Sequence, residues 1–170
     1  MKKAVIIIGQ GFEDSEFFYP YYRLQEDNIH VDVVIAGDRP VKGKYGMSAS
    51  PTMECSQLDV NDYDMAVIPG GHEGPDRARQ VRSVLDFVHQ MNEQGKIIGT
   101  ICHGSWVTIS AGIVKGRTMT CYVGMKDDLI NAGANYVDED VVVDGNIVSS
   151  PHFRNNHQWV REILNAQGFK

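Results

Sequence analysis

The stretch Lys96-Ile-Ile-Gly-Thr-Ile-Cys102-His103-Gly104-Ser105 decides the fold. The apolar run Ile97–Ile101 predicts a buried strand, and the segment Trp106–Gly112 that follows is typical of a helix closed by a glycine. A strand, a tight turn and a helix in this order place the Cys102 thiol at the turn. The dipole and free N–H groups of a helix N-terminus favour a thiolate. The stretch therefore predicts a nucleophilic cysteine at the end of a sheet.

Length and composition limit the class of protein. At 170 residues, with 42% hydrophobic and 22% charged residues, the chain is expected to form a single globular domain over residues 1–170. A net charge of -6 argues against nucleic-acid and anionic-membrane partners. The N-terminal apolar run is too short for a signal peptide, and the three cysteines are few and widely spaced. We therefore expect a cytoplasmic protein without a disulfide framework.

Apolar runs alternate with helical patterns along the chain. Strands are expected at Ala4–Ile8, Val31–Ile35, Met65–Ile68 and Ile97–Ile101, and helices over about Ser15–Asp27, Arg77–Gln94 and Asn155–Gln167. The segment Val41–Met53 is expected to form a hairpin or an excursion, and Val141–Val148 carries an Asp-Gly hairpin turn. Continuous apolar strands that alternate with helices predict an α/β fold with a mainly parallel sheet covered by helices.

Three polar or glycine-rich loops follow strands of this sheet: Gly9–Asp14, Pro69–Asp76 and Cys102–Ser105. In such folds, ligands bind outside the carboxyl ends of the strands. We therefore expect the three loops to meet at one site around Cys102. A buried structural cysteine is the alternative for Cys102, and we interpret Cys55 and Cys121 in that way.

The other candidates each have a functional and a structural interpretation. His103 could act as a base or electrostatic partner of the thiolate, or could simply pack in the turn. Glu13 could donate a hydrogen bond to the sulfur from a poorly solvated pocket, or decorate a helix N-terminus. Gly70 and Gly71 could form an oxyanion hole with the His103 N–H, or an ordinary turn. For Asp76, capping of the following helix is the stronger interpretation.

Two other kinds of site are not supported. The pair Gly9-Gln-Gly11 begins like a dinucleotide-binding loop, but the third glycine is missing and Glu13-Asp14 would repel a pyrophosphate. The adjacent Cys102 and His103 lack spaced partners for a metal ion. We predict neither a cofactor nor a metal.

A series of motifs then points to a family. In order they are Phe12-Glu-Asp-x-Glu16 with Tyr19-Pro20, Pro69-Gly-Gly71, Ile101-Cys-His-Gly104, Ile109-Ser-Ala-Gly112, Gly116-Arg117, Lys126-Asp-Asp128, Ile130-Asn-Ala-Gly133 and Val141-Val-Val-Asp-Gly-Asn146. Over nearly its whole length the chain resembles the PfpI intracellular protease family. This family belongs to the class I glutamine amidotransferase-like superfamily, with the Parkinson-associated DJ protein.

The resemblance implies a flavodoxin-like three-layer sandwich with a nucleophile elbow, assembled into dimers or hexamers. It implies that Cys102 is the nucleophile, that Glu13 hydrogen-bonds its sulfur, and that His103 pairs with an acid from a neighbouring subunit. Alignment on Pro75 assigns that acid to Asp76, where relatives usually carry Glu, and Glu73 is a rival. Tyr122 matches a tyrosine near the pocket and is a candidate substrate contact.

The chain also departs from the family pattern near the expected pocket. Ser105-Trp106 replaces the usual proline after Cys-His-Gly, and Val123 replaces another proline. The segment Pro151–Arg154, with His152, replaces one that in relatives contains Arg, Pro and Asp. These changes leave the nucleophile intact and bear on the choice of substrate.

The resemblance implies several activities. The first is a glutathione-independent glyoxalase or deglycase, in which Cys102 attacks a reactive carbonyl and a nearby acid or base moves a proton. An intracellular cysteine peptidase is the alternative, although no sequence feature identifies a peptide groove. A non-enzymatic oxidation sensor based on Cys102, or a chaperone, is a further alternative.

Overall fold

A computed structural model describes residues 1–168 of the chain, and its centre is a six-stranded sheet. The strand order is β2 (His30–Ile35), β1 (Lys3–Ile8), β5 (Met65–Ile68), β6 (Ile97–Ile101), β10 (Ile147–Ser150) and β9 (Val142–Asp144). Five strands run parallel, and β9 pairs antiparallel with β10 at one edge. The predicted α/β class with a mainly parallel sheet is confirmed.

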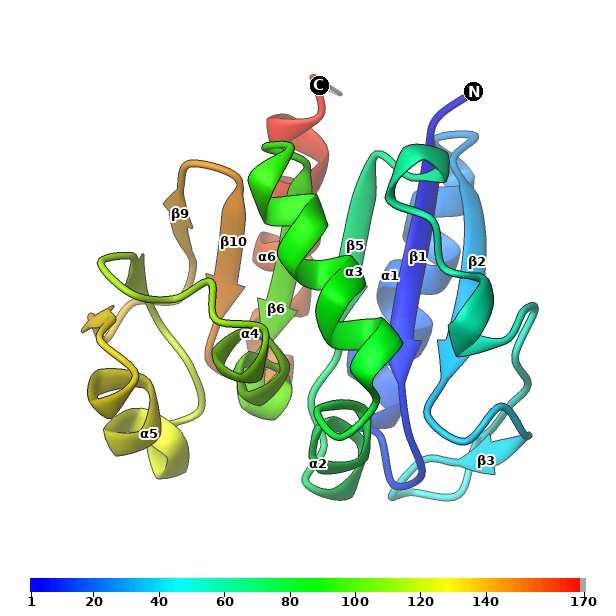
Figure 1. The fold of residues 1–170 in the computed structure, drawn as a ribbon, viewed down its shortest axis with the longest axis horizontal. Helices are drawn as coiled ribbons and strands as arrows, with labels where there is room; N and C mark the ends of the chain where they lie inside the picture. Colours follow the sequence, from blue (N-terminus) through cyan, green and yellow to red (C-terminus); the bar gives the residue numbers. More distant parts are fainter. Residues whose placement is uncertain (169–170) are drawn as a thin grey trace.

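Helices cover both faces of the sheet (Figure 1). The helices α1 (Asp14–Glu26) and α6 (Asn156–Ala166) lie on one face, and α2 (Glu73–Ala78), α3 (Arg82–Glu93) and α4 (Ser105–Ser110) lie on the other. Each face therefore has its own hydrophobic core, one around Trp159 and Ile163 of α6 and one around Phe87 and Met91 of α3. This arrangement is the predicted three-layer sandwich.

The central strands serve both cores because successive side chains of a strand point to opposite faces. Ile6 of β1 belongs to the core with α6, and its neighbours Val5 and Ile7 belong to the core with α3. All residues of β5 and β6 are buried. Strands with two buried faces need continuous apolar sequence, which explains why these runs identified the sheet.

One predicted helix is wrong. The expected helix over Arg77–Gln94 is two helices, because Val81 between α2 and α3 has an extended backbone with φ -93° and ψ 110°. The first of the two begins earlier, at Glu73, with Pro75 in its first turn, where a missing N–H costs no hydrogen bond. Asp76 therefore lies inside α2 and does not cap the following helix.

The remaining elements are short. The expected hairpins form from β3 (Val41–Lys42) with β4 (Ser48–Ala49) and from β9 with β10, where Gly145 has a positive φ. The structure adds β7 (Thr118–Met119), β8 (Asn135–Tyr136) and α5 (Lys126–Asn131), which the sequence analysis did not predict. Single 3-10 turns occupy Cys55–Gln57, Val60–Asp62, Cys102–Gly104, Val123–Met125 and Phe153–Asn155.

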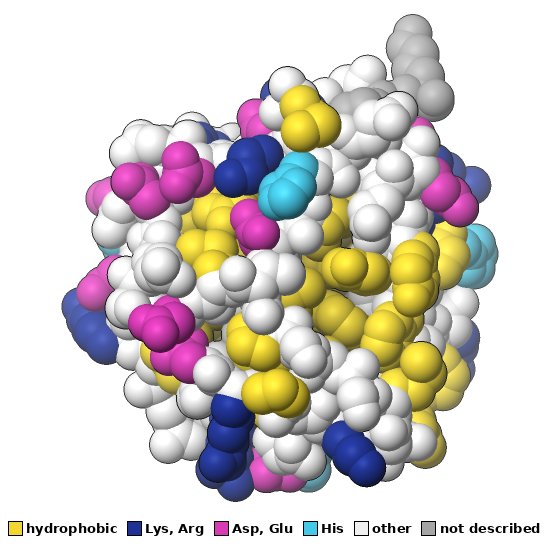
Figure 2. Space-filling model, turned by 90° about the vertical axis from the view of Figure 1, so that its right-hand side faces the viewer, with side chains coloured by type: hydrophobic (Ala, Val, Ile, Leu, Met, Phe, Trp, Pro, Cys, Tyr) yellow, Lys and Arg dark blue, Asp and Glu magenta, His cyan; other side chains and the backbone are white. Residues whose placement is uncertain are grey.

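The surface over α1 is unusually aromatic. Figure 2 shows hydrophobic side chains gathered on the half of this face that lies over α1. The exposed rings of Tyr19 and Tyr22 belong to this helix, and they line a shallow cavity with Phe18. Among the helices of residues 1–168, none is long and apolar enough to cross a membrane.

Gly99 of β6 sets the distance between the sheet and α6. A Cβ atom at this position would lie 2.3 Å from Cδ1 and 3.0 Å from Cγ1 of Ile163. We expect Gly99→Ala to lower the free energy of unfolding by about 1–3 kcal/mol, because it overpacks a closed core. Urea denaturation measures the change.

The companion variant Ile163→Val removes the atom that the new methyl group would strike. In a double-mutant cycle, the cost of Gly99→Ala should be smaller in the Ile163→Val background than in the wild type. Additive costs would show that the loss arises elsewhere, for example from backbone conformation.

Candidate functional site

Cys102 lies in a sharp turn between β6 and α4. Its backbone has a φ of 58°, in the left-handed region that non-glycine residues seldom adopt, and its side chain is 8% exposed. A Cβ atom on Gly104 would lie 2.3 Å from the Ile68 carbonyl oxygen, so the turn presses closely against the end of β5. Strained conformations of this kind cluster at functional sites, and the turn matches the predicted nucleophile elbow.

Glu16, on the first turn of α1, supplies the carboxyl group beside the thiol. Its side chain is fully buried, and Oε2 accepts a 2.7 Å hydrogen bond from the Gly70 N–H. A Cβ atom on Gly70 would lie 2.6 Å from this oxygen and 2.7 Å from the Cβ of Cys102. The end of β5 is thus packed against both side chains, and a hydrogen bond with Cys102 contributes to the environment of Glu16.

The expectation that Glu13 is the carboxyl partner of the sulfur is therefore corrected, because Glu16 lies beside Cys102. Glu13 is the N-cap of α1, and its Oε2 accepts hydrogen bonds from the Glu16 N–H at 2.9 Å and the Ser15 hydroxyl at 2.6 Å. The alternative interpretation, an acid at a helix N-terminus, describes it correctly. Glu16 was part of the quoted motif, but the sequence analysis gave it no role.

The environment keeps Glu16 protonated near neutral pH. Burial, followed by repulsion from the nearby Glu13 carboxylate, raises the pKa of Glu16 from 4.5 to about 8. Its Oε1 atom is buried without a hydrogen-bond partner among residues 1–168, which adds to the cost of the charged form. A neutral carboxyl group can donate a hydrogen bond or a proton to a neighbouring sulfur.

Ionisation of the Cys102 thiol and of the Glu16 carboxyl group at the same time is unfavourable, because their negative charges repel each other. Burial first, and the Glu16 carboxylate second, raise the pKa of Cys102, whereas the backbone N–H groups of His103 and Gly71 and the charge of Lys44 lower it. The repulsive contribution disappears when Glu16 is protonated. The pair is therefore suited to hold a single negative charge, either on sulfur or on oxygen.

His103 is a neutral base in contact with the thiol. Its Nδ1 lies 3.3 Å from the Cys102 Sγ. Burial, and then the nearby His72, lower the pKa of His103 to about 4. The imidazole is consequently uncharged at neutral pH, and its Nδ1 can accept a hydrogen bond from the thiol and take its proton as the sulfur bonds to an electrophile.

The oxyanion-hole prediction needs one change. The Gly71 N–H and the His103 N–H both face the sulfur. The Gly70 N–H is instead committed to Glu16, and the Gly70 carbonyl oxygen accepts from the Glu13 N–H at 3.1 Å. Gly71 and His103 therefore remain as candidate donors to a developing oxyanion, and Gly70 positions Glu16.

Aromatic rings surround the mouth of the site. The His103 ring lies 4.7 Å from the ring of Tyr122, 5.0 Å from that of Trp106 and 5.2 Å from that of His72. The ring of His152 extends this wall, 6.4 Å from Tyr122. Tyr122 is thus beside the site as predicted, and the two departures from the family pattern, Trp106 and His152, border it. His72 is a neighbour that the sequence analysis missed.

The candidate acids of α2 point elsewhere within the chain. Glu73 is exposed and pairs with Arg77 at 2.9 Å, and Asp76 is exposed and accepts a hydrogen bond from Gln80 at 3.3 Å. Both border a surface hollow that also includes His72 and Trp106. A pairing of His103 with an acid of a second subunit stays a prediction.

The other cysteines differ from Cys102 in geometry. Cys55 and Cys121 are buried free thiols whose pKa values are raised to about 12, mainly by burial. The Cys55 sulfur donates to the Ile35 carbonyl oxygen at 3.4 Å. Within residues 1–168, His, Cys, Asp and Glu side chains form no group of three or more that could hold a metal ion.

Comparison with known proteins identifies the family. The model of the DJ-1/PfpI family matches residues 2–166. The chain belongs to the DJ-1/PfpI family. It is 38% identical over 162 residues to Deglycase PfpI of Pyrococcus furiosus, covering 95% of this chain and 97% of that protein. It is also 35% identical over 165 residues to YraA of Bacillus subtilis, which is named as a candidate cysteine protease. That match covers 96% of this chain and 97% of YraA.

Solved structures of the DJ-1/PfpI family share the fold. A two-domain protein from Anabaena variabilis, with DJ-1/ThiJ/PfpI-like and ferritin-like domains, superposes with a TM-score of 0.96 at 33% identity. The match covers 99% of this chain but only 49% of that one, so the chain spans about half of that protein. Drosophila melanogaster DJ-1beta gives a TM-score of 0.87 at 26% identity, with 99% and 98% covered.

The buried Glu16 should make stability depend on pH. The folded protein holds the Glu16 proton up to about pH 8, whereas the unfolded chain releases it near 4.5. Between these values the folded state binds more protons, so the contribution of Glu16 to the free energy of unfolding is complete below pH 4.5 and is lost as the pH rises to about 8.

We expect Glu16→Gln to abolish this dependence. Relative to the variant, the wild type should lose up to about 1.4 kcal/mol of stability per pH unit between pH 5 and 8, measured by urea denaturation. The exposed control Glu26→Gln should follow the wild type. Parallel curves for wild type and Glu16→Gln would mean that Glu16 ionises at its ordinary pKa.

Proposed function

We propose that the protein is a cysteine-dependent enzyme that converts small reactive carbonyls to hydroxy acids, as a glutathione-independent glyoxalase or deglycase. The observation that carries the proposal is the buried Cys102 thiol in contact with both a protonated carboxyl, Glu16, and a neutral base, His103. The names of the Pyrococcus relatives, which are deglycases, support the same class of substrate.

In the first step, the thiol adds to an aldehyde. His103 Nδ1 accepts the Cys102 proton, and Sγ forms a bond to the aldehyde carbon of methylglyoxal. The carbonyl oxygen becomes an oxyanion that the N–H groups of Gly71 and His103 stabilise, and a proton from Glu16 or the imidazolium gives a neutral hemithioacetal.

The next steps move hydrogen between two carbons and release the product. The ionised Glu16, or neutral His103, removes the proton from the sulfur-bearing carbon, and the resulting enediol is reprotonated on the adjacent carbon. This internal redox change yields a thioester, which water hydrolyses to lactate and the free Cys102 thiol. The sum is methylglyoxal plus water to lactic acid, so neither a cofactor nor an external reductant is required.

Lactate formation from methylglyoxal without glutathione tests the proposal. We expect turnover by the wild type and none by Cys102→Ser, since the covalent step needs the thiolate. Glu16→Gln, which keeps the hydrogen-bonding shape but cannot release a proton, should lower kcat by about 100-fold or more. His103→Ala should lower kcat/KM, since a thiol whose pKa is raised by burial needs a neighbouring group to take its proton.

Matched controls separate chemistry from folding. Cys55→Ser removes a buried thiol that contacts the end of β2 and should retain activity in soluble, folded protein. Glu13→Gln should retain a measurable rate, because its role is to cap α1. Full activity of Cys102→Ser, or equal losses for Glu13→Gln and Glu16→Gln, would contradict the proposed roles.

A peptidase is the second candidate because the relative YraA carries a cysteine-protease name. Acyl transfer to Cys102 would use the same thiol and oxyanion donors, with His103 protonating the leaving amine. Turnover of fluorogenic peptides that Cys102→Ser abolishes, without lactate formation from methylglyoxal, would favour this activity over the first.

We also propose that a second copy of the chain covers the aromatic face of α1. Tyr22 is 59% exposed and Tyr19 is 39% exposed, which is expensive for rings that remain in water. Tyr22→Glu should shift the mass measured by analytical ultracentrifugation toward the monomer. Val143→Glu, at the exposed β9 edge, should leave the mass unchanged, and a monomeric wild type would refute the proposal.

A further inference from the structure

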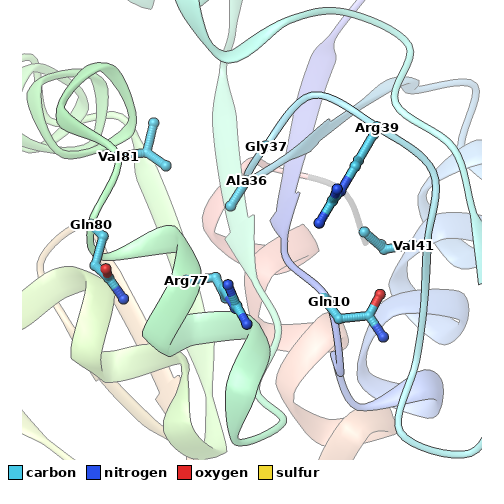
Figure 3. Close-up of a pocket in the computed structure, with 8 residues that line it drawn as sticks. All are labelled: Gln10, Ala36, Gly37, Arg39, Val41, Arg77, Gln80 and Val81. Carbon is cyan, nitrogen blue, oxygen red and sulfur yellow. The ribbon is translucent and has the colours of Figure 1, made fainter.

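A second pocket, distinct from the cysteine site, opens beside the carboxyl ends of β1 and β2. Its volume is about 220 Å³, and its polar lining includes Gln10, Arg39, Arg77 and Gln80, with Val41 and Val81 as apolar walls. Figure 3 shows Arg39 and Arg77 on opposite sides of this space, with Gln10 below Arg39. We call it the arginine pocket.

A constrained turn presents Arg39. After β2, Gly37 and Asp38 both have positive φ values, 94° and 52°, and the Asp38 N–H donates to the Ile35 carbonyl oxygen at 2.8 Å. The Asp38 carboxylate accepts a 2.7 Å hydrogen bond from the Cys55 N–H. Pro40 then fixes the backbone that follows Arg39. The side chain therefore extends from a turn that is held at several points.

The opposite wall is equally fixed. A Cβ atom on Gly9 would lie 2.7 Å from the Gly74 carbonyl oxygen and 3.1 Å from the Arg77 Cβ, so the chain after β1 touches α2 directly. Glu73 orients the Arg77 guanidinium through Nε and Nη2 and leaves Nη1 without a protein partner in residues 1–168. The Gln10 Oε1 accepts from the Lys42 N–H, which leaves its amide N–H₂ as a donor.

The charges of the pocket are unbalanced. None of the described residues that line it is acidic, and Glu73 neutralises only Arg77. The Arg39 guanidinium forms no ion pair within residues 1–168. Two guanidinium groups and a side-chain amide that face one small space match an oxyanion, since arginine binds carboxylates and phosphates in a forked geometry.

We propose that the arginine pocket binds the anionic group of a small molecule, a carboxylate or a phosphate ester. Arg39 carries most of the attraction, Arg77 and Gln10 orient the oxygens, and Val41 and Val81 contact a short apolar part of the ligand. A volume of about 220 Å³ accommodates an anionic group and a short apolar segment attached to it. The proposal does not depend on the chemistry of Cys102.

Titration of ¹⁵N-labelled full-length protein tests the pocket, with inorganic phosphate, acetate and chloride at constant ionic strength. We expect saturable shifts of the Gln10, Gly37 and Arg39 amide signals with phosphate, acetate or both, and none with chloride. Whichever of phosphate and acetate binds more tightly identifies the class of anion. Cys102→Ser should bind with unchanged affinity, which separates this result from the outcome of the lactate assay.

Two substitutions and a control decide whether the pocket is responsible. Arg39→Gln and Arg77→Gln should each weaken binding about tenfold or more, because each removes a charge-assisted contact. Arg82→Gln removes an exposed arginine of α3 that pairs with Asp86 outside the pocket, and it should bind like the wild type. Linear, unsaturated shifts with every anion, or equal weakening in all three variants, would overturn the proposal.

Discussion

The hydrogen bond from the Gly70 N–H to the Glu16 carboxyl joins three parts of the molecule that lie far apart in sequence. It connects the end of β5 to the first turn of α1, and both groups press against Cys102 at the end of β6. Any side chain at position 70 would occupy the space of the carboxyl oxygen or of the cysteine. The geometry of the site therefore depends on a glycine that itself carries no chemistry.

This arrangement opposes stability in two ways, and the sheet compensates for both. The left-handed backbone of Cys102 costs about 1–3 kcal/mol, and a buried carboxyl group is expensive to ionise. The cysteine turn nevertheless follows β6 and abuts β5, two neighbouring strands in which every residue is buried. Strands that are packed on both faces cannot move to relax the backbone of the turn that follows them. The strained conformation of Cys102 is therefore maintained at the position of the thiol.

The fold and the elbow could be predicted from the sequence because both rest on local patterns. Buried parallel strands require continuous apolar runs, and Cys102 follows such a run directly. The break at Val81 was hidden, because apolar residues spaced three and four apart continue across it from Ala78 to Val84. Periodicity reports which face is buried, and it does not report where the backbone leaves the helix.

The choice between Glu13 and Glu16 shows a second limit. Both acids occur in the loop motif after β1, and the distinction depends on the start of α1. Because the helix begins at Asp14, the residue before it must satisfy a free N–H, and the residue three positions later turns inward toward the sheet. A start one residue later, as the sequence suggested, does not separate these roles.

The protonation states of the site explain what it is suited to bind. At neutral pH, Glu16 is protonated and His103 is uncharged, so burial selects a neutral carboxyl, a neutral imidazole and one mobile thiol proton. Under the proposed function, an uncharged dicarbonyl substrate reaches this site without the cost of desolvating a charge. Across α2, the arginine pocket has the opposite character, with two cations and no lining acid among the described residues. The two proposed ligands, an uncharged carbonyl compound and an anion, therefore differ in the same way as the side chains that would contact them.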